Sequence, residues 1–373
     1  MRRITVAPAV LAYAFFAWTG LAAAAGQAGD AIEGSYIVTV KSGKDPKAVA
    51  EEKKAKTKFV YRDAVNGFAA ELSDEQVAAL RKDSRVAAIE HDRVVTASAT
   101  QTNATWGLDR IDQRARPLST TYTYNATASN VYAYVIDTGI YTAHSNFGGR
   151  AANVYDAFGG NGQDCNGHGT HVAGTIGSAT YGVAKSARLR GVRVLNCSGS
   201  GSTSGIIAAL NWLRTNAARP AVANMSLGGG YSSTLNSAAT NVANSGVFLA
   251  VAAGNENQNA CNVSPASASA VFTTASSTRT DAKSSFSNWG SCVEAYAPGS
   301  SITSTWNNGG YATISGTSMA SPHVAGAAAL YKGNFGDAAS STVQSWIISN
   351  ATTNVISGNP SGTPNRLLYE GSL

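Results

Sequence analysis

The sequence GTSMASPHVAG, at residues 316–326, joins a glycine turn to a serine and then to apolar residues at helical spacing. This pattern predicts that Ser318 lies at the start of a helix. Backbone N–H groups and the helix dipole favour negative charge there, so an oxyanion of acyl transfer could form at this position. A serine before an apolar run is also the usual helix N-cap, and this stretch alone leaves both roles open.

Two further stretches supply partners for such a serine. VYAYVIDTG, at 131–139, is a β-branched and aromatic run that stops at Asp137, and NGHGTHVAG, at 166–174, places His168 in a glycine turn before an apolar helix. A serine hydroxyl is a weak nucleophile until a neighbouring base takes its proton. His168 is the candidate base, and Asp137 would orient the imidazole.

The three blocks, in the order Asp137, His168, Ser318, resemble those of the subtilisin-like serine proteases, or subtilases. Within that family they are most similar to the proteinase K branch and to aqualysin-type secreted enzymes, over nearly all of residues 99–369. The resemblance implies a three-layer αβα fold with a mostly parallel central sheet. It also implies a secreted serine endopeptidase that is made as a self-cleaving zymogen and has broad specificity with an apolar S1 preference.

The pattern of the residues after 99 independently favours this fold class. Strand-like runs at 131–137, 189–195, 221–227 and 247–252 alternate with helix-like runs that start near residues 168, 204, 233 and 318. Continuous apolar strands joined by helices predict a buried parallel sheet, with reactive groups at the carboxyl ends of its strands. With 44% hydrophobic and only 13% charged residues, the chain can bury a large core.

Two segments precede this catalytic domain of residues 99–373. Residues 1–25 carry Arg2 and Arg3 before an apolar run and a row of alanines, the layout of a secretory signal peptide; an uncleaved membrane anchor is the alternative. Residues 31–98 are rich in charge and predict a βαββαβ, ferredoxin-like unit. Its place resembles that of the subtilase propeptide, which acts as chaperone and inhibitor; a permanent regulatory domain is the alternative.

The resemblance also implies the residues that contact substrate. Asn255 follows a buried strand and matches the asparagine that faces the oxyanion, although Gly-Asn after a strand is otherwise a turn. Glycine-rich edges could pair with a peptide strand. The predicted substrate-binding residues are Gly199, Ser200, Gly201, Ser226, Leu227, Gly228, Ala252, Ala253 and Gly254. Thr203 replaces an aromatic S4 residue of proteinase K, which argues against a strong aromatic preference in S4.

All four cysteines follow residue 160 and allow three pairings. The resemblance selects Cys165–Cys197 and Cys261–Cys292, and no cysteine lies in a catalytic block.

A structural Ca²⁺ is the one cofactor that the resemblance implies. Its ligands would be backbone oxygens of Ser269 and Val271 with the carboxylate of Glu294, which stands in place of an aspartate. Asp109, Asp112 and Gln113 resemble part of another calcium site, but Ser119 and Thr121 stand at its later ligand positions. A solvated aspartate pair is the alternative there.

Other classes of function fit the sequence less well. The net charge is only +6 and the basic residues are scattered, so nucleic acid is a poor candidate partner. An α/β-hydrolase esterase needs the opposite order, Ser, Asp, His, and a Gly-x-Ser-x-Gly turn. A non-catalytic binding protein would lack a catalytic residue, and none is missing. We expect a secreted monomer that acts on proteins and peptides, has its own propeptide as inhibitor, and makes no membrane contact after signal removal.

Overall fold

A computed structural model describes residues 31–93, 99–371 and 373 of the chain. The predicted signal peptide of residues 1–25 lies outside the described residues. Within the described residues, no helix is both long enough and apolar enough to cross a bilayer.

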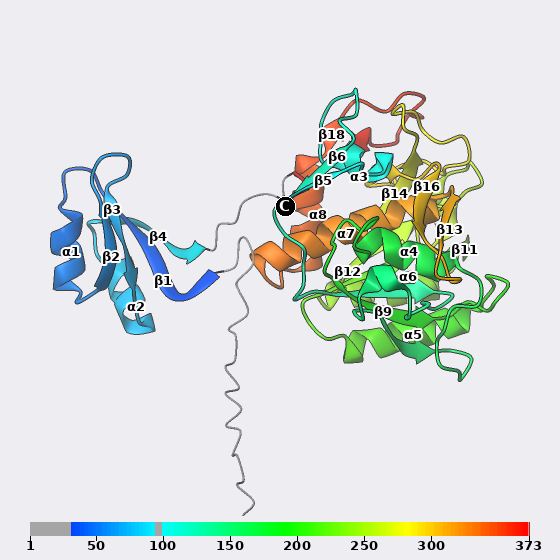
Figure 1. Ribbon diagram of the computed structural model, residues 1–373, viewed down its shortest axis with the longest axis horizontal. Helices are drawn as coiled ribbons and strands as arrows, with labels where there is room; N and C mark the ends of the chain where they lie inside the picture. Colours follow the sequence, from blue (N-terminus) through cyan, green and yellow to red (C-terminus); the bar gives the residue numbers. More distant parts are fainter. Residues whose placement is uncertain (1–30, 94–98, 372) are drawn as a thin grey trace, which may run out of the picture.

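The N-terminal unit has the predicted βαββαβ order (Figure 1, blue). It consists of β1 (Ala31–Val40), α1 (Pro46–Glu52), β2 (Lys56–Tyr61), β3 (Gly67–Glu71), α2 (Asp74–Arg81) and β4 (Val86–Arg93). The strands form an antiparallel sheet in the order β2-β3-β1-β4. A capping box between Ser73 and Gln76 starts α2, as the sequence pattern S-x-x-Q favours. The sheet and helices bury a small core that includes Val38, Phe68 and Leu80.

The larger body is built on a nine-stranded sheet that confirms the predicted fold class. In spatial order its strands are β18 (Thr352–Thr353), β19 (Arg366–Leu367), β15 (Ala295–Pro298), β14 (Phe272–Ser277), β12 (Phe248–Ala252), β10 (Ala221–Met225), β7 (Tyr132–Asp137), β9 (Arg188–Arg193) and β8 (Ala152–Asp156). Every neighbouring pair is parallel except β18 and β19 at one edge.

Helices cover both faces of this sheet and give the three layers (Figure 1). Side chains of successive strand residues point to opposite faces. Accordingly Val222 and Phe248 pack with α4 (His168–Gly177), α7 (Thr317–Phe335) and α8 (Ser340–Asn350). Their neighbours Ala223 and Leu249 pack with α5 (Thr203–Asn216) and α6 (Ser233–Asn244) on the other side. Strands buried on both faces explain why β10 and β12 read as continuous apolar runs.

Smaller elements complete the body. They are β5 (Ala99–Thr102), α3 (Trp106–Ile111), β6 (Thr121–Tyr124), the short helices at Ser145–Phe147 and Ala260–Asn262, β11 (Gly229–Gly230), β13 (Val263–Ser264), β16 (Ile302–Thr305) and β17 (Tyr311–Ile314). β16 and β17 form an antiparallel hairpin directly before α7.

Candidate active site

Three elements bring the predicted reactive residues to the carboxyl-terminal edge of the sheet. Asp137 is the last residue of β7, His168 is the first residue of α4, and Ser318 is the second residue of α7. Open α/β sheets place their sites at this edge. Gly167, the N-cap of α4, has φ +114°, a conformation that side chains with a Cβ rarely adopt.

His168 and Asp137 are joined by a hydrogen bond of 2.8 Å between Nδ1 and Oδ1. Asp137 is fully buried, and its Oδ1 also accepts the backbone N–H of Thr138. Burial lowers the pKa of His168, but the charge and hydrogen bond of Asp137, with the charge of Asp164, outweigh burial and raise the pKa above its usual value. An acceptor at Nδ1 places the proton there and leaves Nε2 as the basic nitrogen.

The Ser318 hydroxyl donates to the backbone carbonyl of Ser226 at 3.2 Å. In return, the Ser226 hydroxyl donates to the carbonyl of Ser318 at 2.7 Å, so the end of β10 and the start of α7 are tied together. The side-chain amide of Asn224 donates a hydrogen bond to the Ser226 hydroxyl. The candidate nucleophile therefore sits directly beside one of the two predicted substrate edges.

Asn255 follows β12 and is oriented by the residue before Ser318. Its Oδ1 accepts the backbone N–H of Thr317 at 2.8 Å and the Thr317 hydroxyl at 3.1 Å. Since Oδ1 of the Asn255 amide accepts these hydrogen bonds, its Nδ2 points away from Thr317. Asn255 and Ser318 line a common cavity of about 440 Å³, together with Ala252 and Gly254.

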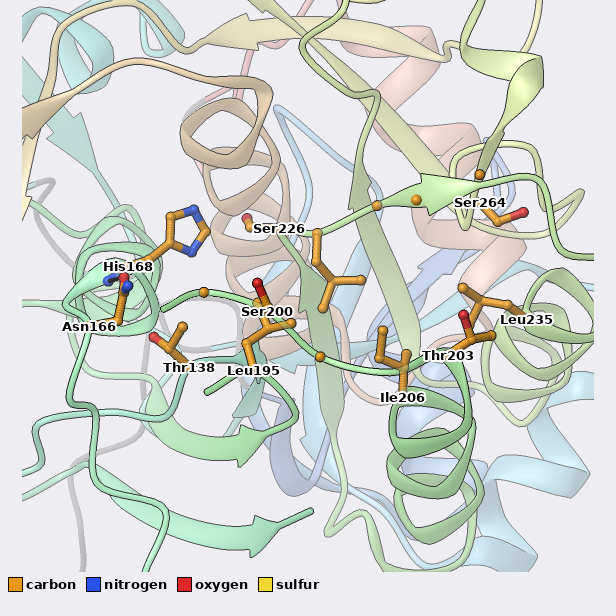
Figure 2. A pocket seen from close by; sticks show the side chains of 16 residues that line it. Thr138, Asn166, His168, Leu195, Ser200, Thr203, Ile206, Ser226, Leu235 and Ser264 are labelled. Carbon is orange, nitrogen blue, oxygen red and sulfur yellow. Dashed lines mark hydrogen bonds between the residues drawn. The ribbon is translucent and has the colours of Figure 1, made fainter. Parts of the chain in front are cut away.

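A second cavity, of about 460 Å³, forms a groove from His168 to Leu235. Figure 2 shows the His168 ring at one end and Thr203, Ile206 and Leu235 at the other. The predicted edges at 199–201 and 226–228 both line this groove. Of the predicted substrate-binding residues, Ala253 alone lines neither cavity; it is fully buried, and its carbonyl accepts the Asn288 side chain.

Sequence reasoning missed several residues of the two cavities. The groove also includes Thr138, Asn166, Ile206, Leu235 and Ser264, and the cavity beside Ser318 includes Glu256, Gln258, Asn262 and Val263. Glu256 directly follows Asn255, so its position in the sequence could have indicated that it lines this cavity. Leu235 and Ser264 come from distant elements and carry no local motif.

Two disulfides join Cys165 to Cys197 and Cys261 to Cys292, the pairing that the resemblance implies. Cys165 lies three residues before His168, and Cys197 lies two residues before the edge at 199–201. The Asn166 side chain also donates to the Cys197 carbonyl at 3.0 Å. The first disulfide therefore ties the histidine loop to a wall of the groove.

The calcium residues expected near Asp109 are engaged in hydrogen bonds within the protein. Asp109 Oδ1 accepts the backbone N–H and the hydroxyl of Ser119, and Asp109 Oδ2 accepts the N–H of Thr120. Gln113 Oε1 also accepts the Ser119 N–H. Asp112 Oδ2 accepts the N–H of Thr123. Ser119, at a position where the resemblance implies a ligand, thus donates hydrogen bonds to Asp109.

The other expected calcium residues lie at the start of neighbouring strands. Ser269 and Val271 precede β14, and Glu294 precedes β15. One carboxylate oxygen of Glu294 accepts the backbone N–H of Thr273. Burial raises the pKa of Glu294 to about 8. Among the described residues, no group of three or more His, Cys, Asp or Glu side chains is arranged to hold a metal ion.

Comparison with known proteins agrees with this architecture. The subtilase family model matches residues 128–367, and the peptidase inhibitor I9 model matches residues 31–98. An alkaline serine exoprotease A of Vibrio alginolyticus is 55% identical over 83% of this chain, which spans 59% of that protein's length. An extracellular serine proteinase of a Thermus species is 49% identical over 92% of this chain and 91% of its own.

A solved structure is also similar, the crystal structure of a cold-adapted subtilisin-like serine proteinase. It is 54% identical, has a TM-score of 0.71, and covers 73% of this chain and 99% of its own. The family model spans well over half of the chain, and the relatives of known activity are serine proteinases. The chain therefore belongs to the subtilase family of serine proteases and carries an I9 inhibitor domain before its protease body.

Proposed function

We propose that the chain is a secreted endopeptidase that hydrolyses peptide bonds through an acyl-enzyme on Ser318. The observation that carries this proposal is the 2.8 Å hydrogen bond between Asp137 and His168, at the end of a groove beside Ser318. The Ser318 hydroxyl turns about its Cα–Cβ bond from the Ser226 carbonyl toward His168 Nε2. His168 then takes its proton as the oxygen attacks the scissile carbonyl.

The remaining steps use the same groups. Asp137 stabilises the imidazolium, and His168 gives the proton to the leaving amine. Water then attacks the ester with His168 as base. The free N–H groups of Asn255 Nδ2, with the backbone N–H of Ser318 in the first turn of α7, donate to the negative oxygen of each tetrahedral intermediate.

The shape of the two cavities supports broad specificity with an apolar preference. A substrate strand lies between the edges at 199–201 and 226–228. The backbone groups of these edges bind the substrate backbone and therefore do not discriminate between substrate side chains. The cavity beside Ser318 takes the P1 side chain, and its walls at Ala252 and Gly254 leave room for a large apolar group. At the far end of the groove, Ile206 and Leu235 form an apolar floor that Thr203 does not cover with an aromatic ring.

We propose that the same active site matures the protein by cutting its own chain once. The predicted self-cleavage between Ser98 and Ala99 involves residues 94–98, which lie outside the described residues. Ala99 itself begins β5 and pairs with Tyr124 of β6, so a new N-terminus at this residue would already be anchored. Residues 31–98 would then stay bound as an inhibitor, in agreement with the I9 match. We propose that the mature enzyme is a monomer.

Calcium is proposed for one of the two expected sites only. The set of Asp109, Asp112 and Gln113 fits less well. Both oxygens of Asp109 and the Oε1 of Gln113 already accept hydrogen bonds from residues 119 and 120, and only Asp112 Oδ1 has no partner among the described residues. Glu294 fits better: it is largely buried, and among the described residues one of its oxygens accepts the N–H of Thr273. With backbone oxygens of Ser269 and Val271, it would hold Ca²⁺ and fix the entry into β14 and β15.

Labelling and cleavage profiling together test this proposal. A fluorophosphonate probe should modify Ser318 of the mature protein, and the unmodified enzyme should cut a denatured proteome internally, mostly after apolar residues. Ser318→Ala should abolish both. Labelling of another residue, or release of terminal residues only, would contradict the proposed endopeptidase.

A further inference from the structure

The β16–β17 hairpin packs directly on the helix that carries His168. The Thr305 hydroxyl donates to the carbonyl of Thr170 at 2.8 Å, and both groups are buried. One turn below His168, the ring of His171 lies within hydrogen-bond distance of two hairpin carbonyls, at 3.0 Å from Ile302 and 3.2 Å from Ala312. Both strands of the hairpin are therefore attached to α4.

The turn of the hairpin reaches the loop just before His168. The Trp306 ring lies against the α-carbon of Gly167: a Cβ added to Gly167 would fall 2.4 Å from two ring atoms. The next residue, Asn307, donates its side-chain amide to the carbonyl of Asp164 at 3.3 Å. Trp306 also meets the ring of His171 edge-on, with the centroids 6.2 Å apart.

The loop that Trp306 covers is held from its inner side by Asp164. This buried carboxylate accepts the N–H groups of Asn166, Gly167 and Thr170, together with the Thr170 hydroxyl. It also accepts the hydroxyl of Thr138, the neighbour of Asp137. The peptide that positions His168 thus lies between a carboxylate on one side and an indole ring on the other.

We propose that Trp306 is a positioning residue for His168, which acts by closing the outer side of the Gly167–His168 peptide. This inference rests on the proposed role of His168 as the base. Without the ring, Gly167 can leave its left-handed conformation, and the start of α4 can shift away from Asp137 and Ser318. Proton transfer depends on that geometry, whereas peptide binding along the two backbone edges does not.

The segment that carries Trp306 also leads to the candidate nucleophile, Ser318. Residues 302–318 run without interruption from the hairpin, through Ser315 and Gly316, to Ser318. Ser315 accepts the N–H of Ser301, and the N–H of Gly316 donates to Gly299, so this connection is itself held in place. The hairpin thereby contacts the helix of the base and leads directly into the helix of the nucleophile.

The test compares Trp306→Ala, Trp306→Phe and a control on the same hairpin, Tyr311→Ala. The Tyr311 ring is half exposed and contacts Tyr181 and His144 rather than the histidine loop. With a short chromogenic peptide anilide, Trp306→Ala should lower kcat by about tenfold to a hundredfold and leave KM within about twofold. Trp306→Phe should recover most of kcat, and Tyr311→Ala should keep it.

A spectroscopic measurement supplies the second readout. The low-field NMR signal of the His168 Nδ1 proton should broaden in Trp306→Ala, because the bond to Asp137 opens to water more often. If Trp306→Ala does not fold, Trp306→Leu keeps part of the apolar volume and should give a smaller loss of kcat in the same direction.

Three results would overturn the inference: kcat within about twofold of the parent despite a lower melting temperature, a rise in KM alone, or an unchanged Nδ1 signal. His168→Ala separates this failure from failure of the proposed function. An active His168→Ala variant would remove His168 as the base, whereas an inactive one beside a fully active Trp306→Ala would remove only the role of Trp306.

Discussion

Asn255 and Thr317 form a two-pronged contact in which both the backbone N–H and the hydroxyl of Thr317 donate to Asn255 Oδ1. The contact joins the end of β12 to the residue immediately before Ser318. It determines which end of the amide is available to an oxyanion, and it does so in the absence of substrate.

Asn255→Leu should therefore reduce turnover far more than binding. Loss of one oxyanion donor costs about 10²–10³ in kcat in enzymes of this kind, with little change in KM. The variant should also mature slowly, since self-cleavage would use the same donor. Steady-state kinetics on a peptide anilide measures this, with Tyr311→Ala, which lines neither cavity, as control. An unchanged kcat would remove Asn255 from the oxyanion role.

The acid limb of the pH–rate profile should lie at a higher pH than the ordinary pKa of an imidazole predicts. The base must be neutral to act, and the pKa of His168 is raised by Asp137 and Asp164 against the opposing effect of burial. Activity is thus lost as pH falls through that raised value. Asp164→Asn should move the acid limb of kcat/KM to lower pH, because one of the two negative charges is removed. A limb that stays in place in this variant would mean that Asp164 does not act on His168.

Ser318→Ala should accumulate as the uncut precursor when expressed alone. The substitution removes only a hydroxyl whose partner is the Ser226 carbonyl, so the fold should persist. N-terminal sequencing of the purified protein in a protease-deficient host is the measurement. A mature N-terminus near Ala99 in that preparation would show that a second protease performs the cleavage.

Glu370→Gln should stabilise the protein at neutral pH. Glu370 is fully buried, and neither of its carboxylate oxygens has a hydrogen-bond partner among the described residues. Burial and then the charge of Asp112 raise the pKa of Glu370 well above 4.5. A raised pKa in the folded state means that its contribution to stability is present below pH 4.5 and is lost as pH rises.

Thermal unfolding of the inhibited mature enzyme at two pH values measures this effect. The gain from Glu370→Gln should be on the order of 1–3 kcal/mol at pH 8 and should vanish near pH 4. A variant that is less stable than the parent at pH 8, and only when calcium is present, would show instead that Glu370 binds a cation.

The sequence predicts well where the candidate catalytic residues lie in the fold, because each lies in a short, continuous motif. Asp137, His168 and Ser318 stand at strand ends and helix starts within a few residues of their predicted positions. The charged residues at 46–56 have the pattern of a helix, but the helix ends at Glu52, because Lys56 already begins β2. Local periodicity indicates the type of an element better than its last residue.

Other features of the fold depend on contacts between distant segments, and no local sequence pattern predicts them. β14, with the sequence FTTASS, is fully buried although four of its six residues are Ser or Thr. Some of its polar groups bond to other segments: the Thr273 hydroxyl donates to Ala266, and the N–H of Ser276 donates to the Ser287 hydroxyl. The hydroxyls of Thr274 and Ser277 are buried and have no hydrogen-bond partner among the described residues. The contact of Trp306 with Gly167 and the burial of Glu370 likewise arise only when distant segments meet.

The Cys165–Cys197 disulfide has a consequence for a protease that can digest itself. The bond joins two residues that are 32 positions apart, and the segment between them includes His168, all of α4 and β9. Ala179 and Thr180 are exposed within this span, with their backbone N–H groups bonded to Asn146, and we take this turn as the position of a possible cut. One cut there leaves the two fragments covalently tethered, with His168 still beside Asp137 through the packing of α4. A nicked molecule should thus run as one band without reductant and as two with it, while it continues to turn over substrate.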